Sequence, residues 1–193
     1  MRTVVPRGAK LIPEEAERVF EGKIFDVYQW QQEMFDGSFA TFEMVKRLDT
    51  VNVFAVRDGK LVILKQEQPG SGEFYSVPGG RHDNADETEL LAAKRECLEE
   101  TGMKFREWKL INVVQPFVKM EWFIYTFLAT GFEGEVVQKL DSGEKIKIEL
   151  MSLDEVKGLV GRLNANSRLD FPREIFDDVE SIEDLENWPE YRG

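Results

Sequence analysis

The alternation of apolar and polar residues predicts a chain made mostly of β-strands. Between positions 19 and 47 the pattern is β-like, and Asp36-Gly37 interrupts it; Asp-Gly between alternating apolar runs is a strong hairpin signal. A second pair of β-branched runs, VNVFAVR and LVILKQ, flanks another Asp-Gly turn at positions 58–59. Further strands are predicted for the segments FYSV, WKLINVVQP, EWFIYTFLAT and KIKIELMSL.

Helical patterns are few. One helix is predicted over residues 87–101, with Gly102 as its C-terminal stop. A second, DEVKGLVGRL, begins at Asp154 as its cap, and a third runs from Pro172 to about Leu185. The order of hairpin, strands, helix, strands and helix predicts an α+β sandwich rather than a regular βαβ array.

These patterns divide the chain into three parts. Residues 1–47 form an antiparallel β unit, of which the first 17 residues read as a loosely held lead-in. Residues 48–165 form the main domain. Residues 166–193 are acidic with scattered aromatic residues and are expected to form a helical tail.

Composition narrows the class of partner. The formal net charge of -12 argues against a general nucleic-acid binder or adhesion to an anionic membrane, because both need basic surfaces. The single cysteine, Cys97, fits a reducing compartment. The N-terminal residues lack the apolar run of a signal peptide, and no apolar stretch is long enough to span a bilayer. We therefore expect a cytoplasmic protein without a nucleic-acid or membrane partner.

The candidate chemistry lies on the helix over residues 87–101. Glu96, Glu99 and Glu100 stand at i, i+3 and i+4 and so share one face. Three neighbouring carboxylates repel one another, whereas a hard divalent cation favours such oxygen ligands. The alternative is a solvated acidic face. The glycine pair at positions 79–80, before the helix, favours the metal site.

This stretch resembles the Nudix box, G-x5-E-x7-R-E-U-x-E-E-x-G-U, in which U is a bulky apolar residue. The matching positions are Gly80, Glu87 and the run R-E-C-L-E-E-T-G-M at positions 95–103. Six residues separate Gly80 from Glu87 instead of five, and we place the extra residue in the loop 82–86. The resemblance implies a Nudix-type α/β/α sandwich with a mixed sheet, preceded here by the small antiparallel β unit.

The resemblance also implies hydrolysis of a nucleoside diphosphate linked to another group, with two or three Mg²⁺ or Mn²⁺ ions. The implied metal ligands are the carboxylates of Glu96, Glu99 and Glu100 and the carbonyl of Gly79. Arg95 can lock a carboxylate in place by a charge-assisted bond. Glu99 and Arg95 are thus the catalytic residues expected within the box, and Glu87, placed in the first helical turn, is expected to be structural.

Other features resemble the ADP-ribose pyrophosphatase subgroup. Pro116 follows Gly102 by fourteen residues, and LKQEQPG resembles the K-Q-x-R-P-G stretch of that subgroup, although Gln68 stands where an arginine is common. Members carry an extra N-terminal β-domain that builds a homodimer. The resemblance implies hydrolysis of ADP-ribose or a related nucleoside diphosphate sugar to a nucleoside monophosphate and a sugar phosphate, with Gln66 and Pro116 near the substrate.

The subgroup often supplies a further glutamate from the loop after the proline. Glu121 is the only carboxylate between Pro116 and Leu128, so it is the candidate general base or extra metal ligand; an ordinary strand-start residue is the alternative. Lys119 and Arg81 are candidates for substrate phosphates, although lone basic loop residues are more often solvated.

Aromatic residues of the N-terminal unit are candidates for base stacking. Tyr28 and Trp30 stand two apart and therefore share one face of a strand, with a core or dimer-interface role as the alternative. His82 is expected to be a hydrogen-bonded loop residue rather than an acid–base catalyst, and Cys97 a buried hydrophobe.

Two other functions stay open. A non-catalytic Nudix-like ligand sensor would usually lose carboxylates of the box, and all of them are present here. A nucleoside triphosphate sanitising pyrophosphatase would often be a shorter chain without the N-terminal β unit.

Overall fold

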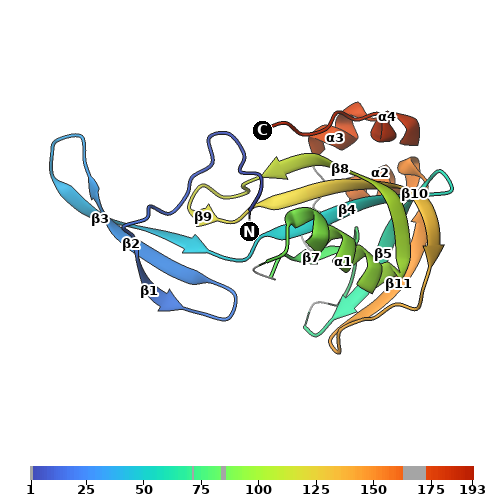
Figure 1. The fold of residues 1–193 in the computed structure, drawn as a ribbon, viewed down its shortest axis with the longest axis horizontal. Helices are drawn as coiled ribbons and strands as arrows, with labels where there is room; N and C mark the ends of the chain where they lie inside the picture. The colour runs from blue at the N-terminus through green and yellow to red at the C-terminus, as the bar shows by residue number, and fades with distance from the viewer. Residues whose placement is uncertain (1, 71, 84–85, 163–172) are drawn as a thin grey trace.

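The computed structural model describes residues 2–70, 72–83, 86–162 and 173–193. Two sheets organise the chain, and the smaller one projects from the body that carries the helices (Figure 1). None of the helices in the described ranges has the length and apolar character needed to cross a membrane.

The smaller sheet has the strand order β1-β2-β3-β9, with strands β1 Glu17–Glu21, β2 Asp26–Glu33, β3 Phe39–Lys46 and β9 Met120–Glu121. The predicted hairpin joins β2 to β3, and Gly37 takes the left-handed conformation (φ 82°) that its turn requires. Strand β9 comes from the loop after Pro116 and runs parallel to β3. That loop therefore belongs to the N-terminal sheet.

The larger sheet has the order β11-β5-β4-β10-β8, with β6 paired to β5 and β7 paired to β4. Its strands are β4 Thr50–Arg57, β5 Lys60–Gln68, β6 Gly72–Ser76, β7 Gly79–Arg81, β8 Met103–Val114, β10 Ile124–Glu135 and β11 Lys145–Met151. Strands β10 and β4 are parallel, whereas the other pairs are antiparallel. The sheet is therefore mixed, as predicted.

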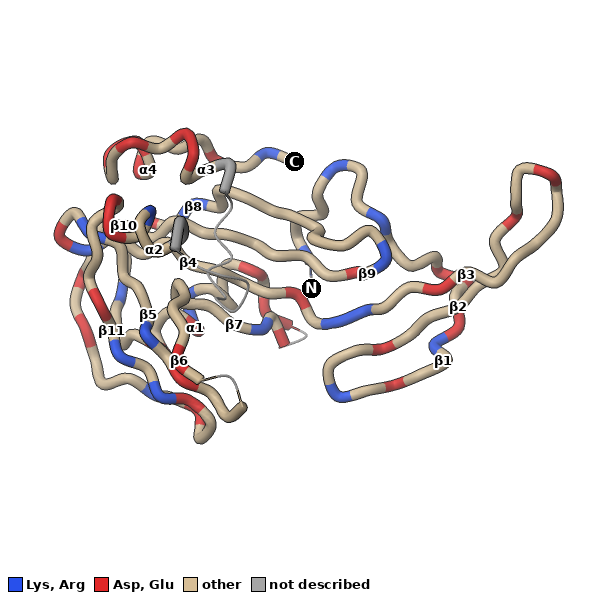
Figure 2. Tube along the Cα trace, turned by 180° about the vertical axis from the view of Figure 1, so that it is seen from behind, with Lys and Arg blue, Asp and Glu red and all other residues tan. Residues whose placement is uncertain are grey.

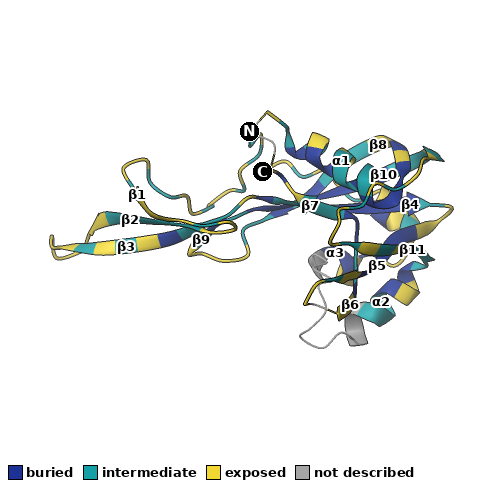
Figure 3. Ribbon diagram, turned by 90° about the horizontal axis from the view of Figure 1, so that it is seen from below, coloured by how far each residue is buried: buried dark blue, intermediate teal, exposed yellow. Residues whose placement is uncertain are grey.

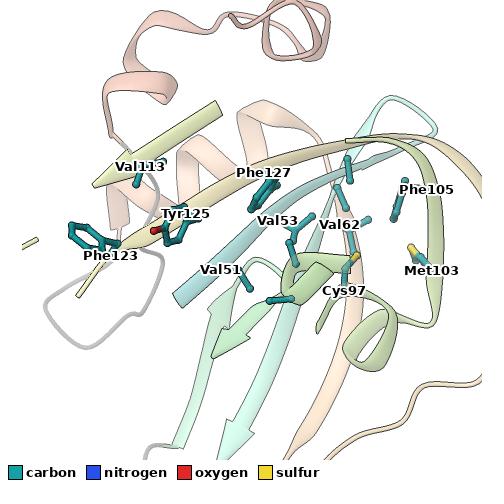
Figure 4. Close-up of a cluster of buried hydrophobic side chains, with 14 residues drawn as sticks. Val51, Val53, Val62, Cys97, Met103, Phe105, Val113, Phe123, Tyr125 and Phe127 are labelled. Carbon is teal, nitrogen blue, oxygen red and sulfur yellow. The ribbon is translucent and has the colours of Figure 1, made fainter. Parts of the chain in front are cut away.

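Helices lie on both faces of this sheet. They are α1 Glu89–Thr101, α2 Leu153–Arg162, α3 Arg173–Asp178 and α4 Ile182–Glu186. One apolar cluster joins α1 to the sheet, where Cys97 and Val53 are fully buried (Figure 4). A second cluster joins the sheet to α2, α3 and α4. The α/β/α sandwich expected from the sequence is confirmed.

Helix α1 begins two residues later than predicted. The hydroxyl of Thr88 accepts from the backbone N–H of Leu91 and caps the helix, so Glu87 precedes the first turn instead of lying in it. Gly102 ends the helix in the left-handed conformation (φ 71°), and a Cβ at this position would meet the Val136 carbonyl oxygen at 2.0 Å. The glycine stop is thus required twice.

The acidic C-terminal segment packs against the body. Ile175, Phe176 and Val179 of this segment are buried with Phe54, whose ring lies 5.3 Å from that of Phe176 in an edge-on contact. Within residues 173–193 the predicted helix is two helices, because Ser181 opens α4 with a capping box; its predicted first residue, Pro172, lies outside the described residues. Acidic positions cluster along α3 and α4 (Figure 2). The segment therefore contributes to the second helical layer.

Candidate active site

The glycine pair brings β7 against both β4 and α1. Gly79 lies so close to β4 that a Cβ there would meet the Val51 carbonyl oxygen at 2.2 Å. Its N–H donates to Oε2 of Glu100 at 2.7 Å. At Gly80 a Cβ would lie 2.4 Å from the carboxylate of Glu96. Two box carboxylates therefore rest on consecutive glycines, where side chains would exclude them.

Arg95 organises the side chains around this cradle. Its guanidinium forms two 3.1 Å bonds to Glu87, a 2.7 Å bond to Glu96 and a 3.3 Å bond to Glu99. It also donates to the backbone carbonyl of Arg81 at 3.1 Å. These contacts, led by the hydrogen bonds to Glu87, raise the pKa of Arg95. One cation thus orients the box glutamates and the loop that precedes them.

The carboxylates of Glu96 and Glu100 accept too few hydrogen bonds to offset the cost of burying their charge. Burial raises the pKa of Glu100 well above its usual value despite the Gly79 N–H, and repulsion from Glu96, Glu144 and Glu99 adds to the rise. Burial also raises the pKa of Glu96, against the opposing effect of Arg95. A divalent cation would relieve this surplus of negative charge, so the donor set suits one.

The described side chains do not yet converge as three ligands around one point. Glu96 is turned to Arg95, and Glu100 is bonded to the Gly79 amide. Binding a cation here therefore requires these carboxylates to exchange their present partners.

The loop 136–144 adds a carboxylate that the sequence analysis missed. Its backbone crosses the C-terminal end of α1, where Lys139 N donates to the Glu99 carbonyl at 2.9 Å and the Gln138 side chain to that of Glu100 at 2.5 Å. Glu144, later in this loop, is close enough to raise the pKa of Glu100. An acidic residue after the glycine of D-S-G-E was the available signal.

Glu121 has other partners. Its Oε1 pairs with Arg2 at 2.7 Å and with Lys46 at 3.0 Å, and its Oε2 accepts from the Ile12 N–H at 2.7 Å. These bonds connect it to the N-terminal segment and to β3. Its neighbour Lys119 lies over the Phe42 ring at 4.6 Å, also within the N-terminal sheet.

Arg81 lies beside a second arginine. The guanidinium of Arg47 is 4.3 Å above the Trp122 ring and 5.7 Å from that of Phe25. Partial burial, followed by repulsion from Arg81, lowers the pKa of Arg47. Neither guanidinium forms an ion pair within the described ranges. Two adjacent unpaired arginines in an acidic protein suit an anionic ligand.

The N-terminal sheet carries a hollow of about 400 Å³, lined by Thr41–Val45 and Lys119. Tyr28 and Trp30 lie opposite Met44 and Phe42 in the strand register and so share their face, as expected. The Trp30 and Phe42 rings are 6.1 Å apart. Exposed residues alternate with less exposed ones along β3, whereas most of β2 has intermediate burial (Figure 3).

The remaining candidate residues differ in their burial and in their hydrogen bonds. Gln66 is buried; its amide N–H donates to Ser76 at 2.5 Å, and its Oε1 has no partner among the described residues. His82 is buried and bonded to the Glu87 carbonyl at 2.6 Å, as expected of a loop residue. Burial raises the pKa of Cys97 to about 12, and Pro116 is exposed.

Comparison with known proteins agrees with this geometry. A family model described as the NUDIX domain matches residues 46–171. An ADP-ribose pyrophosphatase of Bacillus subtilis (strain 168) is 29% identical over 150 residues, which are 75% of this chain and 80% of that protein. A methanol dehydrogenase activator of Bacillus methanolicus is 25% identical over 146 residues, which are 73% of this chain and 78% of that protein.

Solved structures share the fold. An ADP compounds hydrolase superposes with a TM-score of 0.64 at 17% identity, covering 81% of this chain and 85% of the other. A NUDIX hydrolase from Nitrosomonas europaea superposes with a TM-score of 0.56 at 22% identity, covering 75% of this chain and 91% of the other. Since the family model spans more than half of the chain and the box lies within it, this protein belongs to the NUDIX family and is a Nudix pyrophosphohydrolase.

Proposed function

We propose that the protein hydrolyses the diphosphate bond of ADP-ribose or a related nucleoside diphosphate sugar, giving a nucleoside monophosphate and a sugar phosphate. The observation that carries this proposal is the surplus of buried carboxylate on α1, where burial raises the pKa of both Glu96 and Glu100. The substrate class rests on the likeness to the Bacillus subtilis ADP-ribose pyrophosphatase and on the N-terminal sheet.

Glu96, Glu99, Glu100 and the Gly79 carbonyl would hold two or three Mg²⁺ or Mn²⁺ ions. Such ions, when bound, neutralise the diphosphate oxygens and lower the pKa of water. Arg95 contacts Glu96 and Glu99 and would hold both carboxylates on one side of the helix, where a cation could replace it as their partner. Arg81, together with Arg47, would bind the phosphate oxygens not engaged by metal.

We assign the additional carboxylate to Glu144 in place of Glu121. The general base must accept a proton from the attacking water as a new P–O bond forms and the bridging P–O bond breaks. Glu144 is close enough to Glu100 to raise its pKa and accepts one bond, from the Asp141 N–H at 3.2 Å, whereas Glu121 already accepts three bonds from the N-terminal segment and β3.

The N-terminal sheet would pair with a second copy of the chain. Phe20 of β1, Ile24 of the turn that follows and Phe39 at the far end of β3 are 58%, 57% and 65% exposed, so large apolar side chains are exposed at both ends of the N-terminal sheet. In a homodimer the hollow beside Trp30 and Lys119 would receive the nucleoside base. Light scattering after gel filtration should give twice the chain mass.

One assay tests the proposed function. Purified protein is incubated with ADP-ribose, UDP-glucose, GDP-mannose, dinucleoside polyphosphates and dNTPs, with Mg²⁺ or Mn²⁺, and the products are separated by chromatography. We expect AMP and ribose phosphate from ADP-ribose. Preferred cleavage of dNTPs would identify a sanitising pyrophosphatase instead. Binding of one compound without turnover of any would identify a ligand sensor.

A further inference from the structure

Residues 2–12, which we name the N-terminal strap, hold a second group of buried carboxylates. Arg2 binds Asp49 through two bonds of 2.6 and 3.0 Å and Glu121 through one of 2.7 Å. Its guanidinium also lies 4.5 Å from the Phe123 ring centre. Both carboxylate side chains are only 5% exposed, so Arg2, rather than water, stabilises their negative charges.

Thr3 binds the metal-binding helix itself. Its backbone N–H and its hydroxyl each donate to one carboxylate oxygen of Glu89 at 2.5 Å. Glu89 is the first residue of α1 and is 2% exposed. Next along the strap, the Val4 carbonyl accepts from the hydroxyl of Tyr125 at 2.7 Å.

The far end of the strap is held as well. The Ile12 N–H donates to Glu121, and the Gln115 side chain bonds both backbone groups of Lys10 at 2.8 Å. Val4 and Ala9 pack against the apolar cluster beneath α1. The lead-in expected to be loose is therefore bonded to the body at residues 2–4, 10 and 12.

These bonds reach both halves of the active site. Glu89 fixes the start of the helix that carries the box glutamates. The carbonyl of Asp49 accepts from the His82 N–H at 2.9 Å, next to the glycine strand β7, and its side chain also accepts from the Phe123 N–H. The strap thus contacts the helix through Glu89 and the glycine cradle through Asp49. The position of the helix relative to the cradle sets where the Glu96 and Glu100 carboxylates lie.

We propose that the N-terminal strap sets the position of α1 against the glycine cradle and that Arg2 is a positioning residue for metal binding and hydrolysis. The role in hydrolysis rests on the function proposed above, whereas the role in metal binding does not depend on the substrate. Partners that orient metal ligands at one remove commonly alter metal affinity or activity by about ten- to a hundredfold when lost.

The test compares Arg2→Met with Arg7→Met. Arg7 lies on the same strap, is exposed and forms no ion pair among the described residues, so its variant makes the same charge change without loss of an ion pair. Mn²⁺ affinity is measured by calorimetry without substrate, and kcat and KM with ADP-ribose, at a temperature where circular dichroism shows each variant folded.

We expect Arg2→Met to weaken Mn²⁺ binding and to lower kcat/KM by roughly tenfold each, with Arg7→Met at the wild-type level. Arg2→Lys keeps the positive charge and should restore part of the Mn²⁺ affinity. The restoration should be incomplete, because one ammonium cannot form the forked contacts by which the guanidinium joins Asp49 to Glu121. If Arg2→Met does not fold, Thr3→Val, which loses one bond to Glu89, should weaken Mn²⁺ binding in the same direction by a smaller factor.

A lowered melting temperature with Mn²⁺ affinity and kcat/KM equal to those of Arg7→Met would overturn the proposal and leave the strap a stabilising element only. The failure of the proposed function looks different. In that case the wild-type protein binds Mn²⁺ but cleaves no substrate of the panel, and the two Mn²⁺ affinities still decide the role of the strap.

Discussion

Two groups of carboxylates in the described ranges, one wholly buried and one only partly buried, differ in what surrounds them. The strap carboxylates are Asp49, Glu89 and Glu121; the box carboxylates are Glu96, Glu99 and Glu100. Each strap carboxylate accepts bonds at both of its oxygens, from Arg2, Lys46 or N–H and hydroxyl groups. The box carboxylates share one arginine and one glycine amide.

The pKa shifts follow this difference. Although burial alone would raise it, the pKa of Glu121 is lowered by the Ile12 N–H, Lys46 and Arg2. Burial prevails at Glu96 and Glu100, whose pKa values rise. At these three glutamates the supply of donors, and not burial alone, therefore decides the direction of the pKa shift.

The largest effect is expected for Glu100→Gln. The amide would remove one of the proposed metal ligands, so kcat with ADP-ribose and Mg²⁺ should fall at least about a hundredfold. Stability without metal should not fall, because an amide at a 5% exposed position loses the cost of burying a charge. Steady-state kinetics and a melting curve in EDTA measure both. Near-normal turnover would remove Glu100 from the metal ligands.

Glu121→Gln should instead lower the stability and leave most of the activity. Its loss leaves Arg2 and Lys46 without a shared partner, and we expect the free energy of unfolding to drop by about 2 kcal/mol, less than for a fully buried pair because both cations are partly exposed. Activity of the folded variant should stay within about tenfold of wild type. Glu144→Gln is the matched control and should lower kcat with little effect on stability. An inactive but stable Glu121→Gln would restore Glu121 as the general base.

A smaller effect is expected for Gly80→Ala. The added methyl group would lie 2.4 Å from the Glu96 carboxylate, which must move away from the cradle. We expect the Mn²⁺ affinity to fall by roughly tenfold, in line with displacement of a single ligand. Gly143→Ala is the control, since a Cβ there meets nothing closer than 3.8 Å. Equal affinities in the two variants would show that Glu96 adapts.

The comparison also explains what the sequence could predict. The box helix, both Asp-Gly hairpins and the mixed sandwich follow from local patterns: periodicity, turn residues and a motif with fixed spacing. Glu96, Glu99 and Glu100 were predicted together because one helix turn places them together. The caps at Thr88 and Ser181, which shift or divide the predicted helices, are also local but depend on which hydroxyl reaches which N–H.

The strap and the loop 136–144 could not be predicted in this way. Arg2 and Glu121 are 119 positions apart, and nothing in the spacing of either residue indicates the other. Glu144 reaches Glu100 only because the loop crosses the end of α1. For the same reason Glu121 and Glu144 look alike in the sequence: Glu121 begins a predicted strand, and Glu144 immediately precedes one.

The smallest expected effect is a pH dependence that separates the two groups. A carboxylate whose pKa is lowered on folding adds stability above its unfolded pKa, about 4.3, and loses that contribution as the pH falls through the folded value. Glu121 has such a lowered pKa. The stability difference between wild type and Glu121→Gln in EDTA should therefore be constant near neutral pH and shrink below about pH 4.3, by at most about 1.4 kcal/mol per pH unit for one proton. Urea unfolding at several pH values measures it, and a difference that does not change with pH would mean that Glu121 stabilises the fold by packing rather than by charge.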